Sequence, residues 1–136
     1  MKMDYPGKFE RICSLDDIYE GEAKLFELNK YEIIILNVKG QIRAYYARCA
    51  HALGLIEPNS YDGEDRIICP VHLWEYNALT GESINPSGSS LFPLEVKIEG
   101  NGIFVKVPSV PVSEFKVKWF KIYSQGGGIN EFGINS

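Results

Sequence analysis

Short segments of the chain alternate between apolar and polar residues, and glycine or proline separates one segment from the next. Residues 94–99 alternate strictly, which predicts a half-buried strand, and residues 103–107 return after a Gly-Asn-Gly turn. Residues 32–38 instead contain an uninterrupted run of three isoleucines and a leucine, which predicts a buried strand. A Lys-Gly turn leads from this strand into residues 41–47, so we expect the two to form a hairpin. The pattern as a whole predicts an all-β fold.

Smaller elements are expected at both ends and in the middle of the chain. Residues 8–13 predict a first strand, and Ser14 is expected to cap one helical turn in which Asp17 lies three residues on. In the middle of the chain, we expect strands over residues 66–68 and 74–76 and a polar loop over residues 85–90. Residues 115–119 alternate apolar side chains with lysines, which predicts an edge strand, and the glycine-rich residues after 125 predict a flexible tail.

Length and composition narrow the class of protein. A chain of 136 residues with 45% hydrophobic and 24% charged residues fits a single globular domain. No apolar run approaches the roughly 20 residues that span a bilayer, and the first residues lack the apolar core of a signal peptide, so we expect a soluble cytoplasmic protein without a membrane partner. The net charge of −4 argues against a nucleic-acid partner, and three cysteines, an odd number, argue against a disulfide framework.

The candidate chemistry lies in two Cys-His pairs. Cys49 and His51 are separated by one residue, Cys69 and His72 by two, and seventeen residues lie between the pairs. The chain has no other histidine. Two thiolates on one iron and two imidazoles on the other are the ligands of a Rieske [2Fe–2S] centre, whose reduction potential is roughly −150 to +300 mV rather than near −400 mV. Zinc also accepts two cysteines and two histidines, so a zinc-stapled binding module remains the alternative.

The resemblance to a known family extends beyond these ligands. The chain resembles Rieske ferredoxins, and most of all the ferredoxin component of toluene-4-monooxygenase-like diiron multicomponent monooxygenases. The segments that carry the resemblance are residues 9–18, His72-Leu73-Trp74, Asn77, Thr80-Gly81, 84–86 and 93–97. It implies a Rieske domain over residues 8–107, in which an antiparallel β-sandwich carries a small cluster-binding subdomain with its loops within residues 47–90. Residues 108–136 are then a C-terminal extension.

The same resemblance implies a function. The protein is expected to be an electron carrier that passes single electrons from an NAD(P)H-dependent flavin and iron–sulfur reductase to a diiron hydroxylase that oxidises aromatic or alkene substrates. A ferredoxin of a Rieske ring-hydroxylating dioxygenase is the alternative. Cys49 and Cys69 are expected to bind one iron, and His51 and His72 the other. No catalytic residue is expected, because the sequence offers no nucleophile–base pair or paired acid–base carboxylates.

Five further residues are expected around the cluster or at its docking edge: Gly54, Leu73, Trp74, Tyr76 and Pro86, the last in a proline loop over the cluster. Trp74 is either an exposed docking aromatic or part of the packing under its loop. Tyr76 is expected in the core or as a hydrogen-bond donor near the cluster, and Cys13 as a buried structural thiol. Respiratory Rieske proteins have a serine where this chain has Trp74, which predicts a reduction potential at the low end of the Rieske range.

Overall fold

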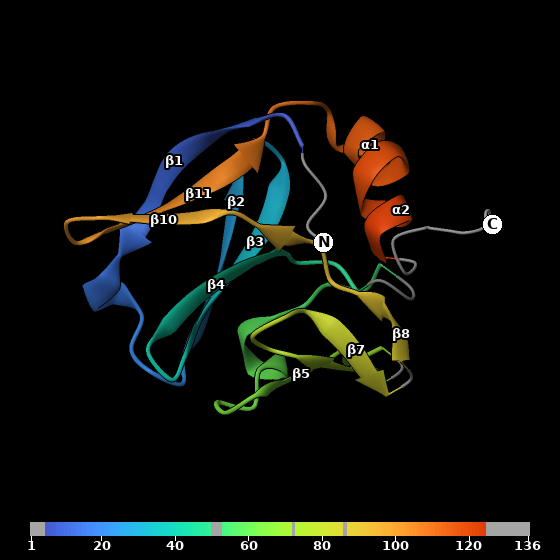
Figure 1. Cartoon of the computed structure of the whole chain (residues 1–136), viewed down its shortest axis with the longest axis horizontal. Helices are drawn as coiled ribbons and strands as arrows, with labels where there is room; N and C mark the ends of the chain where they lie inside the picture. Colours follow the sequence, from blue (N-terminus) through green and yellow to red (C-terminus); the bar gives the residue numbers. More distant parts are fainter. Residues whose placement is uncertain (1–4, 50–52, 72, 86, 125–136) are drawn as a thin grey trace.

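The computed structural model describes residues 5–49, 53–71, 73–85 and 87–124 of the chain. Within these ranges the chain forms eleven strands in three antiparallel sheets, followed by a helical segment (Figure 1). The all-β prediction is therefore confirmed for the region before residue 109. None of the helices in these ranges is long and apolar enough to cross a membrane.

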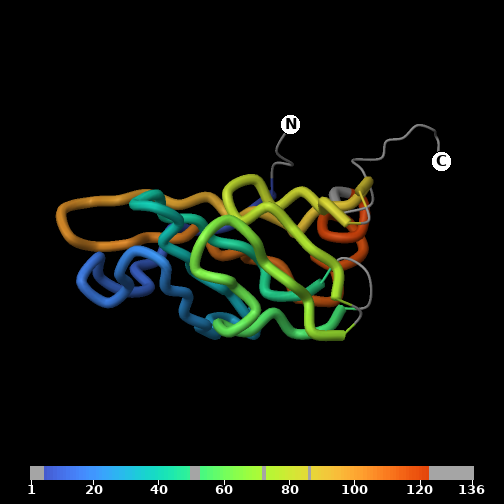
Figure 2. The backbone as a smooth tube through the Cα atoms, turned by 90° about the horizontal axis from the view of Figure 1, so that it is seen from below, coloured from blue at the N-terminus to red at the C-terminus, as the bar shows by residue number. Residues whose placement is uncertain are grey.

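The first sheet brings together strands from near the start of the chain and from residues 96–108. Its strands, in spatial order, are β1 (Gly7–Ser14), β11 (Gly102–Pro108) and β10 (Val96–Glu99). The predicted first strand and the closing hairpin are confirmed, and so is the turn after β1, where Asp17 accepts the N–H of Ser14 at 2.8 Å. The β10–β11 hairpin projects at one end of the molecule and the C-terminal helical segment lies at the other (Figure 2).

The second sheet contains the predicted hairpin and one strand that the sequence did not reveal. Its order is β2 (Ala23–Leu28), β3 (Tyr31–Val38), β4 (Gln41–Tyr46) and β9 (Pro93–Leu94). The strand expected over residues 94–99 is thus divided between two sheets. Leu94 pairs with Ala44 in β4, whereas Val96 pairs with Val105 in β11, so the chain passes from one sheet to the other at Glu95.

The third sheet forms a small separate layer below β4 in Figure 1. Its strands are β5 (Arg66–Ile68), β6 (Glu75–Asn77), β7 (Glu82–Asn85) and β8 (Ser87–Ser90). The polar loop expected over residues 85–90 is wrong, because most of this segment pairs as β7 and β8. The Ser83 hydroxyl accepts the N–H of Ser89 and donates to its carbonyl, which stabilises a hairpin that has no apolar pattern.

The edge strand predicted over residues 115–119 is also wrong, because this segment is helical. The helix begins with α1 (Val112–Phe115), passes through a π-helical turn (Lys116–Phe120) and ends with α2 (Lys121–Ser124). Phe115 and Phe120 are both buried, although five residues in a regular α-helix rotate the side chain by about 140°. The wider π-helical turn brings both rings to the same side of the helix.

Two hydrophobic cores share strand β3. Ile33 and Ile35 face a core between the first two sheets, which the two phenylalanines of the C-terminal helix complete. Ile34 and Leu36 face a second core, which lies against the third sheet. A strand that is buried on both faces needs apolar residues at consecutive positions, which explains the uninterrupted run in the sequence.

Candidate metal centre

The first ligand loop follows β4 and begins at Cys49. The N–H of Cys49 donates to the carbonyl of Gly54 at 2.8 Å, and its carbonyl accepts the N–H of Leu53 at 2.9 Å. Leu53 has a φ of 58°, in the left-handed region, where the chain turns back. An antiparallel bridge between Arg48 and Leu55 closes the loop at its base. Cys49 therefore lies at the start of a tight, closed turn.

The second ligand loop joins β5 to β6 and repeats this turn. The N–H of Cys69 donates to the carbonyl of Trp74 at 2.8 Å, and its carbonyl accepts the N–H of Leu73 at 2.9 Å. Leu73 has a φ of 59°. The pairing of Ile68 with Glu75 closes this loop at its base. The same backbone turn is thus built twice, once after each of the two cysteines.

The two predicted imidazole ligands lie outside the described residues. His51 follows Cys49 by two positions, whereas His72 follows Cys69 by three. In both loops, however, the closing hydrogen bonds join the cysteine to the fourth and the fifth residue after it. Among the described residues, no three His, Cys, Asp or Glu side chains come together as a metal site. Two of the four predicted ligands, the histidines, are not among these residues. The structure therefore places the two thiols and their loops.

Both cysteines of the motif are buried in the second core. Cys49 and Cys69 each expose 1% of their surface. The Tyr76 hydroxyl, on the strand that follows Cys69, lies 3.1 Å from the Sγ of Cys49 on the other loop. Tyr76 is itself fully buried, so both roles expected for it, core residue and hydrogen-bond partner, are combined.

Gly54 lies where the two loops touch. A Cβ atom at this position would lie 2.3 Å from Cγ2 of Val71 and 3.8 Å from the Sγ of Cys69. A larger residue would push the loops apart, so glycine is required for their close approach. Gly54 thus lies next to the second cysteine, and its place beside the metal stays a prediction.

The residues after His72 differ in exposure. Trp74 is half-buried against the second core, with its ring 6.5 Å from the ring of Tyr76. Leu73 exposes 68% of its surface. This position fits Trp74 packing under its loop better than Trp74 as an exposed docking aromatic. Pro86 lies outside the described residues.

An ion pair that the sequence did not reveal holds the first loop. The Arg48 guanidinium makes two hydrogen bonds to the Glu32 carboxylate, and its Nη1 donates to the carbonyl of Leu53 at 3.1 Å. The hydrogen bonds to Glu32 raise the pKa of Arg48, so its guanidinium remains charged. Because the two residues are sixteen positions apart, no local pattern could have indicated this contact.

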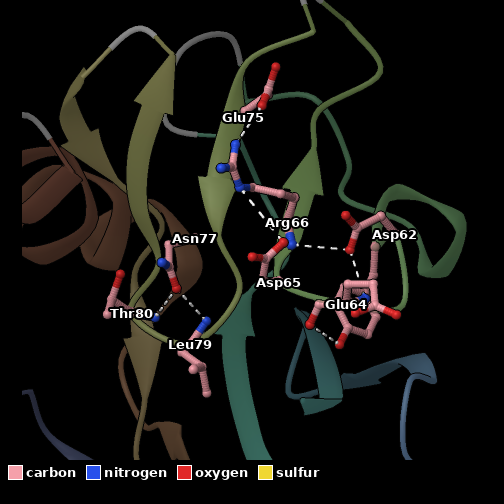
Figure 3. A network of polar contacts seen from close by, with 9 residues as sticks. Asp62, Glu64, Asp65, Arg66, Glu75, Asn77, Leu79 and Thr80 are labelled. Carbon is pink, nitrogen blue, oxygen red and sulfur yellow. Dashed lines mark hydrogen bonds and ion pairs between the residues drawn. The ribbon is translucent and has the colours of Figure 1, made fainter. Parts of the chain in front are cut away.

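A second polar network holds strands β5 and β6, which flank the second loop (Figure 3). Arg66 donates to Glu75 at 3.0 Å across the two strands. Asp62 accepts the N–H of Arg66 at the start of β5, and Asn77 accepts the N–H of Leu79 in the turn after β6. These bonds fix both strands that lead to and from Cys69.

The third cysteine is separate from this site. Cys13 lies in the first core and exposes 6% of its surface. Burial raises the pKa of its thiol, and the charge of Asp17 raises it further. The prediction of a buried structural thiol is confirmed.

The Rieske [2Fe–2S] domain family matches residues 8–108. The chain is 28% identical over 102 residues to the alkene monooxygenase ferredoxin component of Xanthobacter autotrophicus, covering 74% of this chain and 82% of that protein. It is 30% identical over 94 residues to the ferredoxin component of the naphthalene 1,2-dioxygenase/salicylate 5-hydroxylase systems of a Ralstonia species, covering 68% and 89%.

Solved structures show the same fold. The Sphingomonas yanoikuyae B1 ferredoxin superposes with a TM-score of 0.64 at 20% identity, over 74% of this chain and all of that one (100%). A chain from the oxygenase–ferredoxin complex of carbazole 1,9a-dioxygenase superposes with a TM-score of 0.65 at 22% identity, over 74% and 94%. The protein thus belongs to the Rieske [2Fe–2S] domain family, and its cofactor is one Rieske-type cluster. Its ferredoxin relatives support the role of an electron carrier.

Proposed function

We propose that Cys49 and Cys69 bind one iron of the cluster and that His51 and His72 bind the other. Two buried thiols that begin two turns closed by equivalent backbone hydrogen bonds are the observation that carries this assignment. In both loops the backbone of the cysteine bonds the fourth and fifth residues after it, so the two thiols begin equivalent turns. When bound, the cluster accepts and releases one electron at a time.

The protein side chains around the thiols favour a stable, reducible centre. Both cysteines are shielded from water, and Tyr76 is close enough to donate a hydrogen bond to the Cys49 thiolate. Such a bond stabilises added negative charge on the sulfur, so it favours the reduced state. The contact between Gly54 and Val71 keeps the two loops together.

The physiological electron acceptor is proposed to be the hydroxylase of a multicomponent monooxygenase, with an NAD(P)H-dependent reductase as donor. The similarity to the alkene monooxygenase ferredoxin component over 82% of its length supports this choice. The similarity to the naphthalene dioxygenase-type ferredoxin component supports a second candidate, transfer to a Rieske dioxygenase. In both cases the chain carries electrons for an oxygenase.

Optical and EPR spectra of anaerobically purified protein test the metal assignment. A red-brown protein that bleaches with dithionite, with an average g below that of all-cysteine ferredoxins, is the expected result. A colourless protein with stoichiometric zinc would contradict it.

The acceptor is tested separately by mixing the reduced protein with the alkene monooxygenase oxygenase component or the naphthalene dioxygenase oxygenase component. Faster electron transfer to the first supports the monooxygenase assignment, and faster transfer to the second supports the alternative.

A further inference from the structure

A cavity of about 640 Å³ lies at the junction between the family-matched region and the C-terminal extension. One wall comes from the β2–β3 turn and the neighbouring ends of β3 and β4, and the other from residues 109–116, which follow the matched residues 8–108. Arg48, which holds the first ligand loop, lines this cavity, whereas Cys49 and Cys69 do not. The cavity is therefore separate from the metal centre, and the extension completes it.

One wall of the cavity contains a buried hydroxyl that bonds nothing in the described ranges. Tyr46 is fully buried, and its hydroxyl has no hydrogen-bond partner there. The neighbouring Tyr31 differs, because its hydroxyl donates to the carbonyl of Val110. A buried donor without an acceptor is costly and rare in native proteins. The Tyr46 hydroxyl is therefore a candidate contact for a ligand that enters the cavity.

The charged side chains that line the cavity are mostly positive. In the described part of the chain, the ammonium groups of Lys30 and Lys116 have no partner, and Arg48 is the third cation. Glu32 is the one acidic residue in the described lining, and it is already bonded to Arg48. Three cations and one carboxylate give the lining a net charge of +2, in a protein whose net charge is −4. This local excess favours a ligand with two negative charges.

The size and the neutral polar groups of the cavity narrow the ligand class further. A volume of about 640 Å³ lies within the range of small-molecule sites. The hydroxyls of Ser109 and Ser113 line the cavity together with Tyr46, and all three can donate hydrogen bonds to oxygen atoms. A small molecule that combines two negative charges with several oxygen acceptors matches both the charge and the donors.

We propose that this cavity binds a small dianion with oxygen acceptors, of the kind that a phosphate group or a dicarboxylate provides. The Tyr46 hydroxyl donates to one of its oxygens, and Lys30 and Lys116 neutralise its charge. Because the hydroxyl is closed off from solvent, binding includes a shift of the side chains that cover it. The ligand thereby satisfies a donor that otherwise stays unpaired.

Arg48 connects this site to the metal centre. It lines the cavity, and its Nη1 donates to the Leu53 carbonyl in the first ligand loop. Negative charge near the cluster disfavours an added electron, so the dianion should bind the oxidised protein more tightly than the reduced one. By linkage, the bound dianion should lower the reduction potential. This coupling rests on the proposed electron-carrier function, whereas the binding itself does not.

Isothermal titration calorimetry of the oxidised holoprotein tests the site. The probes are inorganic phosphate and succinate, at constant ionic strength and at a pH where both are dianions. The variants are Tyr46→Phe and Lys116→Gln. Their matched controls are Tyr61→Phe, whose hydroxyl bonds the carbonyl of Glu64, and Lys118→Gln, whose ammonium group is exposed on the same helix and paired with Glu114.

The wild type should bind at least one probe saturably, at one site per chain. Tyr46→Phe should weaken this binding about tenfold, since it loses a hydrogen bond to a charged group, and Lys116→Gln about threefold. Both controls should bind like the wild type. Tighter binding of phosphate identifies a phosphate-bearing ligand, and tighter binding of succinate a dicarboxylate. In a redox titration of the wild type, the probe should shift the potential to more negative values, as expected for at least about threefold tighter binding to the oxidised protein.

Two calorimetric results would overturn the site: no saturable binding of either probe, or binding that Tyr46→Phe and Lys116→Gln leave unchanged, which would mean an adventitious ion only. A reduction potential that does not move when the probe saturates the protein would overturn the coupling through Arg48. A protein that binds the probe but contains no reducible cluster would instead contradict the proposed function, so the two failures are distinguishable.

Discussion

The hydroxyl of Tyr76, on strand β6 after the second ligand loop, lies 3.1 Å from the Sγ of Cys49 in the first ligand loop. A phenol that donates a hydrogen bond to a thiolate sulfur stabilises the electron-rich state of the centre. The expectation of a potential at the low end of the Rieske range stays a prediction. What the structure adds is a named donor whose effect on the potential can be measured.

Tyr76→Phe should lower the reduction potential. A hydrogen bond to a charged group contributes about 1.5–3 kcal/mol, and the bond is present in both redox states. If about half of that contribution depends on the added electron, the shift is roughly 40–60 mV for one electron. A redox titration followed by visible absorbance measures the shift. Tyr61→Phe is a matched control, because its hydroxyl bonds the carbonyl of Glu64 instead of a sulfur. Equal potentials in wild type and Tyr76→Phe would show that the bond does not tune the centre.

Tyr46 presents the opposite case, a buried hydroxyl without a hydrogen-bond partner among the described residues. Burying an unpaired hydroxyl is unfavourable, so Tyr46→Phe should leave the free energy of unfolding unchanged or raise it by about 1 kcal/mol. Tyr31→Phe should lower it by about 1 kcal/mol, since its hydroxyl donates to the carbonyl of Val110 at 2.5 Å. Urea unfolding of the two variants measures the contrast, and equal losses would contradict this account.

At the scale of elements, the Glu32–Arg48 pair connects strand β3 to the first ligand loop. Arg48→Met removes the bonds to Glu32 and to the Leu53 carbonyl, which together contribute about 1–3 kcal/mol to the closed loop. The cluster should therefore be lost several-fold faster to an iron chelator, as followed by the decay of its visible absorbance. Arg11→Met, whose guanidinium makes a solvent-exposed bond to the hydroxyl of Ser14, is the control and should not change that rate.

The C-terminal helix is an integral part of the first core although it lies outside the matched family region. The Phe115 ring makes edge contacts with the rings of Tyr31, Tyr46 and Phe92, at centroid distances of 5.3, 5.2 and 4.9 Å. Phe115→Ala should lower the free energy of unfolding by about 3–5 kcal/mol. Val117→Ala on the exposed side of the helix should change it by less than about 0.5 kcal/mol. Denaturant unfolding that shows no loss in Phe115→Ala would mean that the helix does not support the fold.

For the whole molecule, two buried tyrosines predict how stability depends on alkaline pH. Burial raises the pKa values of Tyr31 and Tyr46 from 10.0 to about 12. A raised folded-state pKa means that the stabilising contribution is complete below pH 10 and is lost as the pH rises through 12. Urea midpoints measured across this range should fall, and they should fall less in Tyr46→Phe. Parallel curves for wild type and variant would contradict the assignment to Tyr46.

Much of the second and first sheets could be predicted from the sequence, because alternation and tight turns are local. The β3–β4 hairpin is specified by its apolar run and a Lys-Gly turn, and the β10–β11 hairpin by alternating residues and a Gly-Asn-Gly turn. The β7–β8 hairpin could not be predicted, since its residues are mostly serine and its bonds run through a side chain. A strand was predicted over residues 115–119 because apolar residues alternate with lysines there. The helix that forms instead buries Phe115 and Phe120 through a π-helical turn, and this spacing of five matches no regular helix pattern.

The sequence by itself restricted the chemistry of the site to a Rieske cluster or a zinc ion, because the identity of the donor atoms and their spacing limit which metal centres two Cys-His pairs can form, and the family match favours the cluster. It also determined the all-β class, since local periodicity reports which faces are buried. Only the tertiary structure decided which groups surround the thiols. Tyr76 beside Cys49, Arg48 on Glu32 and Gly54 against Val71 are contacts between separate elements, and packing alone brings them together.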